Sequence, residues 1–345
     1  MPDELLDSQV QSLNLPGLIS HYNIAGRLLR VHALGDWETQ WVTSFLRGFH
    51  LVPTDVTNVQ PAITLTVKRA PLPPVPLQLQ SFAINRGDCF TDGTEYFLTV
   101  DESLIHIAAP QSRLVEVFFG ITEQARHPVA LVNAFSYGLQ AALRRASVFD
   151  VHAAGAVEPQ SQAGVLFVGA SGSGKTTLTL RLTEAGWLYL SDDMVVLRGT
   201  PSGLEAEGLR RLFAVADTSV VGESSSRLNA ALGTPVASDP SKRRLEPETV
   251  FPQSRAKSCR PRLLFFPRVV DAHDTTITKL TTRAAMEQLL RHCPWATYDR
   301  TTAPAYLHAL AGLANQCSAY ELAAGRDLLI HPKRAADLLA RYLTE

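Results

Sequence analysis

The pattern of apolar and polar positions divides the chain into two regions. Residues 1–128 carry short apolar or alternating runs of strand length, at Ala62–Val67, Leu77–Ile84, Glu95–Val100, Leu104–Ala108 and Leu114–Phe119. The turn-forming residues Thr91–Thr94 predict a β-hairpin connection. The proline-rich stretch Ala70–Pro76 predicts an extended connector, because proline donates no hydrogen bond to a sheet. With a short helix expected around Trp37–Phe49, the pattern predicts a smaller β-rich (α+β) N-terminal domain, with substrate or partner recognition as its candidate role.

After residue 128 the pattern changes to one of alternating helices and strands. Apolar residues at helical spacing cover Val129–Val148, and Arg144 and Arg145 suit the C-terminal end of that helix. Strand-length runs are expected at His152–Val157, Gly164–Val168 and Leu263–Phe266, and further helices at Thr282–His292, Pro304–Gln316 and Pro332–Leu343. This order predicts an α/β domain over residues 129–345.

Composition narrows the class of protein. The 345 residues are enough for two domains, and 46% hydrophobic with 19% charged residues is typical of a soluble globular chain. With 32 basic and 33 acidic residues the formal charge is −1, so no global field favours nucleic acid or an anionic membrane. The first twenty residues lack a basic start and an apolar core, and no apolar run approaches the roughly 18 residues of a membrane span. We therefore expect a cytoplasmic protein with neither nucleic acid nor membrane as partner.

Four cysteines stand far apart without a CxxC pair, at Cys89, Cys259, Cys293 and Cys317. This spacing favours reduced thiols over a zinc site or a disulfide framework.

A glycine-rich motif carries the strongest chemical signal. The run GVLFVGASGSGKTTLTLRL matches the G-x-x-x-x-G-K-[ST] pattern at Gly169, Gly174, Lys175 and Thr176. Such a loop turns backbone N–H groups toward a triphosphate, and the helix that begins there favours the anion. Lys175 would contact the β and γ phosphates, and the Thr176 hydroxyl would ligate Mg²⁺. The motif predicts an ATP site that comprises Gly169, Ser171, Gly172, Ser173, Gly174, Lys175, Thr176 and Thr177.

An acidic pair follows the helix that starts at this loop. Trp187–Leu197 predicts two short strands around Asp192 and Asp193. Carboxylates at a strand end are typical Mg²⁺ ligands in phosphate-loop enzymes. Neighbouring side chains point in different directions, so one can face a metal and the other an attacking group. His152 opens the strand-like run HAAGAV, where a single histidine is more often structural than catalytic.

These three pieces together resemble the C-terminal catalytic domain of HPr kinase/phosphorylase and its HPr-kinase-like relatives. The resemblance covers residues 150–200 and implies a mixed central sheet of the HPr kinase and phosphoenolpyruvate carboxykinase type. It also implies that Asp192 is the general base on the substrate hydroxyl, that Asp193 assists with the metal, and that His152 lies near the reacting groups. The sequence alone would allow the two aspartates to exchange roles. Enzymes of this family are often homo-oligomers, although no interface is indicated here.

The sequence departs from the bifunctional enzymes in two places. Thr177 stands where they carry a glutamate, and the second signature loop with its phosphorolysis arginine is not found. Phosphorylase activity and HPr itself are therefore not expected. The chain looks most like stand-alone serine kinases, including those that modify ribosomally made precursor peptides.

A polar region at residues 222–262 and the strand after it carry many basic residues: Lys242, Arg243, Arg244, Arg255, Lys257, Arg260, Arg262 and Arg268. A cationic lid over the phosphates would place charge where phosphoryl transfer needs it. A solvated loop is an equally good interpretation.

The sequence thus predicts a Mg²⁺-ATP-dependent kinase that acts on a hydroxyl, with a serine of a peptide or protein as the favoured acceptor. Two alternatives remain open. One is a small-molecule hydroxyl kinase, and the other is a non-enzymatic, nucleotide-gated regulatory protein.

Overall fold

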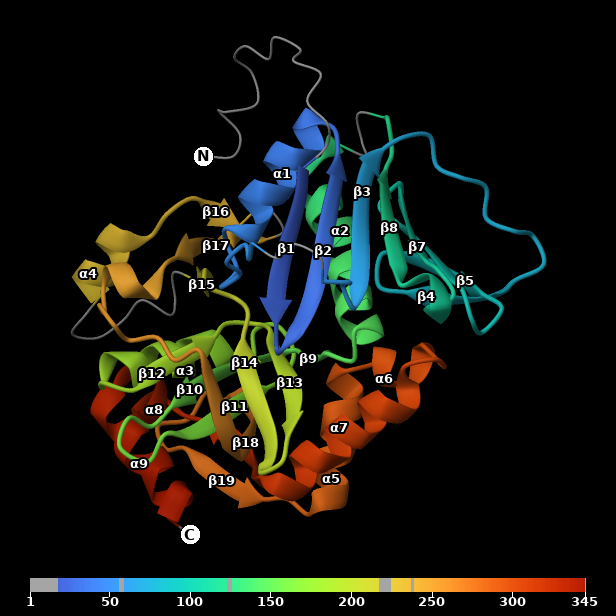
Figure 1. Cartoon of the computed structure of the whole chain (residues 1–345). Helices are drawn as coiled ribbons and strands as arrows, with labels where there is room; N and C mark the ends of the chain where they lie inside the picture. Colours follow the sequence, from blue (N-terminus) through green and yellow to red (C-terminus); the bar gives the residue numbers. More distant parts are fainter. Residues whose placement is uncertain (1–17, 56–58, 123–125, 217–224, 237–238, 345) are drawn as a thin grey trace. The chain divides into compact units, whose positions relative to one another are not determined.

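The chain forms two compact units (Figure 1). The computed structural model describes residues 18–55, 59–122, 126–216, 225–236 and 239–344. No secretory signal was expected in the first twenty residues, and most of these lie outside the described residues. The first unit comprises Met1–Val148 with Asp299–Pro304, and the second comprises Phe149–Tyr298 with Ala305–Glu345. The boundary between the two compact units therefore falls after residue 148, because the helix at Pro128–Arg145 packs on the sheet of the first unit. The functional domains predicted at 1–128 and 129–345 stay a prediction.

The first unit is built on a curved mixed sheet. Its strand order in the described residues is β1-β2-β3-β8-β7-β6-β5-β4. Strands β2, β3 and β8 run parallel to one another, and the remaining pairs are antiparallel. The strands are β1 (Leu18–Ile24), β2 (Arg27–Leu34), β3 (Ile63–Arg69), β4 (Gln80–Ile84), β5 (Gly87–Thr91), β6 (Tyr96–Val100), β7 (Ser103–Ile107) and β8 (Leu114–Phe119).

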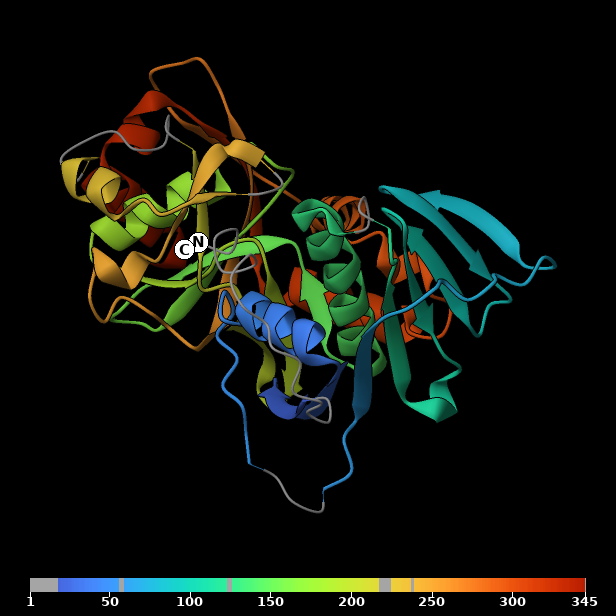
Figure 2. The ribbon, with the colours of Figure 1, turned by 90° about the horizontal axis from the view of Figure 1, so that it is seen from above.

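Helices α1 (Asp36–Leu46) and α2 (Pro128–Arg145) cover one face of this sheet (Figure 2). The alternation along each strand explains why, because Leu65 on β3 and Val117 on β8 are fully buried while their sequence neighbours face away. Gly138 of α2 lies so close to Val117 that an added Cβ would meet its Cγ2 at 2.3 Å. Aromatic rings of the two helices pack on each other, with Trp41 and Phe135 centroids 5.6 Å apart. The opposite sheet face carries polar side chains such as Thr64, Lys68 and Glu116 together with the apolar Leu104 and Phe118.

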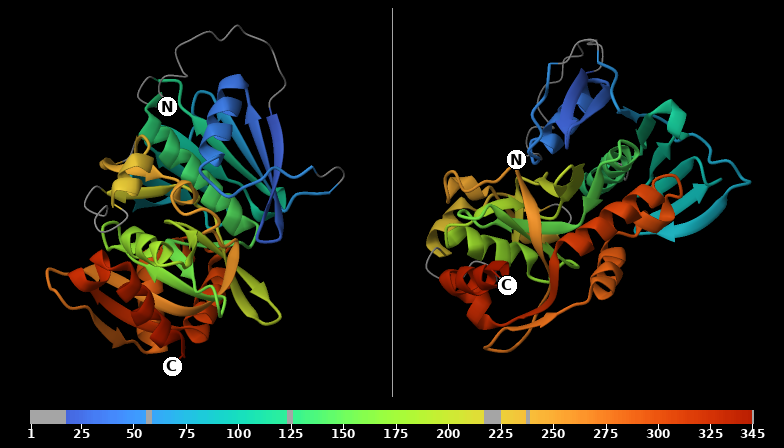
Figure 3. Two further views of the ribbon diagram at one scale, coloured as in Figure 1. Left: turned by 90° about the vertical axis from the view of Figure 1, so that its left-hand side faces the viewer. Right: turned by 60° about the horizontal axis from the view of Figure 1, so that its bottom comes forward.

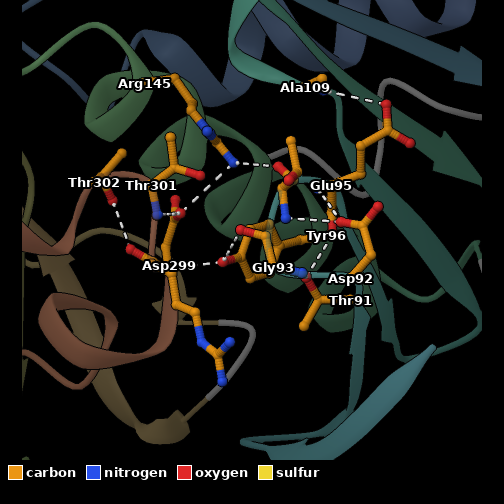
Figure 4. A network of polar contacts seen from close by, with 12 residues as sticks. Thr91, Asp92, Gly93, Glu95, Tyr96, Ala109, Arg145, Asp299, Thr301 and Thr302 are labelled. Atoms are coloured by element: carbon orange, nitrogen blue, oxygen red, sulfur yellow. Dashed lines mark hydrogen bonds and ion pairs between the residues drawn. The ribbon is translucent and has the colours of Figure 1, made fainter.

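A buried ion pair anchors the segment 299–304 within the first unit (Figure 4). Arg145 Nη2 and Asp299 Oδ1 lie 3.6 Å apart, with side-chain exposures of only 4% and 1%. Arg145 also donates to the Thr94 carbonyl at 3.2 Å, but its Nε and Nη1 are buried without a hydrogen-bond partner. The Arg300 N–H donates to the Tyr96 hydroxyl at 2.9 Å. The charge of Asp299 is therefore the main compensation for a buried guanidinium.

The second unit contains the mixed central sheet. Its described strands follow the order β12-β10-β11-β18-β14-β13-β9, with β20 paired to β18 and β19 paired to β20. Strands β11, β18 and β20 are parallel, and the other pairs are antiparallel. The strands are β9 (Phe149–Val151), β10 (Ala153–Val157), β11 (Ala163–Val168), β12 (Leu188–Ser191), β13 (Val195–Thr200), β14 (Gly203–Gly208), β18 (Ser258–Val269), β19 (Thr276–Lys279) and β20 (Ser318–Ala324).

Helices α3 (Lys175–Glu184), α8 (Arg326–Ile330) and α9 (Pro332–Thr344) pack together on the central sheet (Figure 3). Their apolar stripes bury Leu178, Leu182 and Leu339 against Phe167 and Phe265 of the sheet. The remaining helices of this unit are α4 (Ser225–Ala231), α5 (Thr282–His292), α6 (Trp295–Tyr298) and α7 (Ala303–Gln316).

A small antiparallel sheet lies beside α3 and β12. It has the order β15-β17-β16, formed by β15 (Phe213–Ala216), β16 (Pro235–Val236) and β17 (Asp239–Leu245). Phe213 and Leu245 bury against Tyr189 and Leu180. This position brings β17, with its basic residues, close to the start of α3.

Most predicted elements are confirmed, with boundaries shifted by a few residues. The helix expected at Thr282–His292 is α5, and the connector at Ala70–Pro76 carries no strand or helix. The predicted turn Thr91–Thr94 joins β5 to β6. The polar region 222–262 differs from a plain solvated loop, because its described part contains α4, β16 and β17.

The expectations for membrane segments and cysteines can also be compared with the structure. Among the described residues, no helix is both long and apolar enough to cross a membrane. Cys89, Cys259, Cys293 and Cys317 are buried and unbridged.

Replacing Asp299 by Asn should destabilise the protein, because Arg145 would remain buried without an opposite charge. Removal of one partner of a buried pair costs about 3 kcal/mol. The free energy of unfolding, measured by urea titration, should fall by about that amount. The change Asp271→Asn, at a side chain that is 90% exposed, is the matched control and should have almost no effect.

The double variant Arg145→Met/Asp299→Asn distinguishes charge compensation from a simple packing defect. It should lose less stability than the sum of the two single changes. Strict additivity would contradict the pairing.

Candidate functional site

The glycine-rich loop 169–174 connects β11 to α3 and has room for a ligand. Gly172 and Gly174 adopt φ values of +81° and +98°, which side chains rarely tolerate. Around Gly172 nothing lies within 4 Å of the position that a Cβ would occupy. Helix α3 begins after Gly174 without a side-chain cap. Its first N–H groups can therefore bind an anion. Ser173 Oγ is buried in this loop without a hydrogen-bond partner.

Lys175 is held inside the loop. Only 6% of the residue is exposed, and its Nζ donates to the Gly169 carbonyl at 2.6 Å and the Ala170 carbonyl at 3.0 Å. Burial lowers the pKa of Lys175, although the charges of Asp193 and Asp192 act in the opposite direction. The ammonium is thus fixed where the loop and the acidic pair meet.

The two aspartates point to different neighbours. Asp192 is 3% exposed; its Oδ1 accepts from the Thr176 hydroxyl at 2.8 Å, and its Oδ2 accepts from the Ala214 N–H at 2.9 Å. Asp193 has a left-handed φ of +72°. Its side chain, 47% exposed, lies 3.3 Å from His152 Nδ1 through its Oδ1. Aspartate tolerates this backbone conformation better than most residues, which lets adjacent carboxylates diverge.

His152 links Lys175 to Asp193. It lies between β9 and β10, with Nε2 3.3 Å from Lys175 Nζ. Since an ammonium only donates, Nε2 must accept in this contact, and the neutral ring carries its proton on Nδ1. That proton faces the Asp193 carboxylate. Desolvation lowers the pKa of His152 more than the charge of Asp193 raises it, which favours the neutral ring.

The environments of the two carboxylates move their pKa values apart. Burial and the adjacent charge of Asp193 raise the pKa of Asp192 to about 6. The hydrogen bonds from the Ala214 N–H and the Thr176 hydroxyl act in the opposite direction but are weaker. For Asp193, desolvation also raises the pKa, but the nearby His152, Arg210 and Lys175 outweigh it and lower the pKa below its usual value. Neighbouring acids with separated pKa values are typical of sites that divide chemical roles between them.

The structure brings the predicted residues together around one site. Thr176, Asp192, Asp193, His152 and Lys175 are joined by the contacts above, and Thr177 lies in the first turn of α3. Their assigned roles stay predictions.

The basic segment does not act as one unit. Lys242 of β17 donates to Ser171 Oγ at 3.1 Å and pairs with Asp239 at 3.0 Å. Its neighbour Arg243 instead donates to the backbone carbonyls of Gly233 and Leu232. Arg260, Arg262 and Arg268 belong to β18. Only part of the segment therefore approaches the loop, and a nucleotide-dependent lid stays a prediction.

Sequence reasoning missed three contributors. Arg210, between β14 and β15, lowers the pKa of both aspartates. Its N–H donates to Ser191 Oγ at 2.9 Å. The Ala214 N–H is a backbone donor, and no sequence signal marks it. His292 lies at the end of α5; desolvation lowers its pKa most, and the nearby charge of His152 lowers it further. The adjacent Arg210 and Arg211 are the one sequence feature that could have pointed to this charge.

Comparison with known proteins gives limited information. No protein-family model matches the chain, and no curated protein matches it. Among solved structures, the HPr(Ser) kinase/phosphatase from Coxiella burnetii is similar at 12% sequence identity and a TM-score of 0.29, over 56% of this chain and 95% of that chain. A likeness this distant carries no argument about function.

The raised pKa of Asp192 predicts a pH-dependent stability cost. The folded protein keeps the Asp192 proton up to about pH 6, whereas the unfolded chain loses it near pH 4. Stability from this group is therefore greatest at low pH and declines as pH rises through that window. Asp192→Asn should gain stability relative to the parent by up to about 3 kcal/mol between pH 4 and pH 7.5.

Urea unfolding across this pH range measures the effect. Asp274→Asn, at a side chain that is 81% exposed, serves as the control and should track the parent at every pH. A constant difference between Asp192→Asn and the parent across the range would overturn the prediction.

Proposed function

We propose that this chain is a Mg²⁺-ATP-dependent kinase that transfers the γ-phosphoryl group to a hydroxyl, most favourably to a serine of a peptide or protein. The observation that carries the proposal is the divergence of two adjacent carboxylates beside one glycine-rich loop. Asp192 bonds to Thr176, and Asp193 faces outward next to His152. One metal-side carboxylate and one free carboxylate are what phosphoryl transfer to a hydroxyl requires.

The residues around the loop fit a nucleotide and a hard cation. The uncapped start of α3, the open space at Gly172 and the unpartnered Ser173 hydroxyl suit phosphate oxygens. Lys175 would hold the β and γ phosphates, and Thr176 with Asp192 would hold Mg²⁺ through oxygen ligands. Bound Mg²⁺-ATP would supply the phosphoryl group that the acceptor oxygen takes as the β–γ bridge bond breaks.

The contacts support a division of roles that is the reverse of the one implied by the family resemblance. The Thr176–Asp192 hydrogen bond, at 2.8 Å, supports Asp192 as the metal-side carboxylate. Asp193 is the more exposed of the two, and the Nδ1 proton of His152 orients it. In this division Asp193 accepts the proton of the substrate hydroxyl, and His152 positions it. Arg210 contributes positive charge near both.

One observation favours a kinase over a nucleotide-gated switch. A switch needs a metal-side carboxylate and a positioned water, but it does not need a second, outward-facing carboxylate that a neutral histidine orients. The Asp193–His152 pair has no role in a pure switch. A small-molecule acceptor would use the same groups, so acceptor identity is a matter for assay.

Lys175→Ala should weaken ATP binding at least tenfold and reduce phosphoryl transfer more than about 100-fold, because the charge on the β and γ phosphates is lost. Calorimetric ATP titration and transfer of labelled γ-phosphate to serine peptides measure the two effects. Lys279→Ala, at an exposed position on β19, is the control and should behave like the parent. Full turnover by Lys175→Ala would sink the assignment.

The two aspartates should fail in different ways. Asp193→Asn should bind Mg²⁺-ATP almost normally yet lose transfer by about 10²-fold or more, because a base matters only when an acceptor is present. Asp192→Asn should raise the Mg²⁺ concentration needed for nucleotide binding.

The same calorimetric and transfer assays separate the candidates. If Asp192→Asn is the variant that binds normally and fails to transfer, the division implied by the family resemblance is correct and the one proposed here is wrong. If both variants transfer at the parental rate, the kinase proposal itself fails and the switch gains support.

A further inference from the structure

The first unit has a hollow on the sheet face opposite α1 and α2. Its volume is about 580 Å³, within the range of small-ligand sites. Arg30 of β2 and Thr64 of β3 are register partners on this face, and they belong to the wall. The lining residues are Arg30, Val59, Gln60, Pro61, Thr64, Gln111, Ser112 and Arg113.

Local structure fixes the side chain of Arg30 and the backbone of Arg113. Arg30 Nε donates to His21 Nε2 at 3.2 Å, which uses one of the five N–H groups of the guanidinium. Arg113 follows the short 3₁₀ turn η1 (Pro110–Ser112) with a left-handed φ of +49°. Its carbonyl accepts from the Thr64 N–H at 2.8 Å, and its own N–H donates to the Pro110 carbonyl at 3.2 Å. A non-glycine residue in this conformation, bonded through both backbone groups, is a built feature of the wall.

The charged side chains of the hollow are all positive. Among the described residues, its lining contains two guanidinium groups and no carboxylate. Further along the same face the acidic Glu116 is compensated, since it lies 2.8 Å from Lys68 Nζ and 3.2 Å from His106 Nδ1. Around the two arginines, amides and hydroxyls of Gln60, Gln111, Ser112 and Thr64 supply neutral donors and acceptors.

We infer that this hollow binds an acidic segment of a peptide, with its carboxylates on Arg30 and Arg113 and its backbone on the surrounding amides and hydroxyls. Guanidinium groups pair with carboxylates through two parallel hydrogen bonds, which gives geometric selectivity. The hollow is larger than one carboxylate needs. Nucleic acid is the weaker fit, because no aromatic side chain in the lining could stack a base. A role of the same peptide as the phosphate acceptor rests on the proposed function, whereas its binding to the hollow does not.

The test is direct binding in the absence of nucleotide. A fluorescein-labelled peptide of alternating Ser and Asp is titrated with the full chain, and anisotropy is compared with that of a peptide of alternating Ser and Asn. The Asp peptide should bind at least tenfold more tightly, and its affinity should fall as salt is raised. Because no transfer is measured, failure here and failure of the kinase proposal are seen separately.

Variants locate the binding. Arg30→Gln and Arg113→Asn should each weaken the Asp peptide about fivefold to tenfold and leave the Asn peptide unchanged. Asparagine suits the left-handed φ of position 113, so that variant keeps the wall intact. Arg30→Lys, which keeps the charge, should retain much of the affinity if the Gln variant unfolds. Arg27→Gln, on the same strand but outside the hollow, is the matched control and should bind like the parent.

Three results would overturn the inference. One is equal affinity for the Asp and Asn peptides, or no binding of either. Another is a loss of affinity in Arg27→Gln as large as in Arg30→Gln. The third is tighter binding of an oligothymidylate of equal charge, lost in the same two hollow variants, which would identify the ligand as nucleic acid.

Discussion

A buried carboxylate organises the second unit. Asp192 lies where β12 ends, and it accepts one hydrogen bond from the first turn of α3 and another from β15. A charge in this position is costly unless donors compensate it. The two donors therefore tie three elements that are distant in sequence: the helix after the glycine-rich loop, the edge of the central sheet and the small sheet that carries Lys242. The raised pKa of Asp192 shows that the compensation is incomplete. Keeping this carboxylate ionised at neutral pH therefore costs stability.

The left-handed backbone of Asp193 decides which neighbours its carboxylate meets. With an ordinary extended backbone, both carboxylates would sit on opposite sides of a strand. The φ of +72° instead brings Asp193 beside His152 while Asp192 stays with Thr176. The chain of contacts from Lys175 through His152 to Asp193 also fixes a tautomer, since the ammonium can only donate. Geometry and electrostatics thus give the two neighbours different chemistry.

In the described part of the first unit, the helices α1 and α2 cover one face of the sheet. Residues such as Leu65 and Val117 meet α2, and the alternate positions Thr64 and Glu116 face the opposite side. That side carries charges and a polar hollow beside the buried apolar residues Leu104 and Phe118. Within the same unit, the buried Arg145–Asp299 pair holds a segment from late in the sequence. The inner face of the sheet therefore serves packing, and the outer face carries the hollow at Arg30 and Arg113.

Local patterns in the sequence determined the helices and located the glycine-rich loop. Periodicity predicted α2, α5, α7 and α9 within a few residues, and the glycine-lysine-threonine spacing identified Lys175 and Thr176, because both signals depend only on nearby positions. Tertiary structure decided what those signals could not. The contact of Asp192 with Ala214 N–H, the charge of Arg210 on Asp192 and the approach of Lys242 to Ser171 all join segments at least 18 residues apart. Ala214 and Lys242 belong to a small sheet that the sequence pattern did not predict. The hollow at Arg30 and Arg113 likewise exists only because parallel pairing sets β2, β3 and β8 side by side. Which side chains meet depends on strand order and register, and these are settled by the packing of the whole unit.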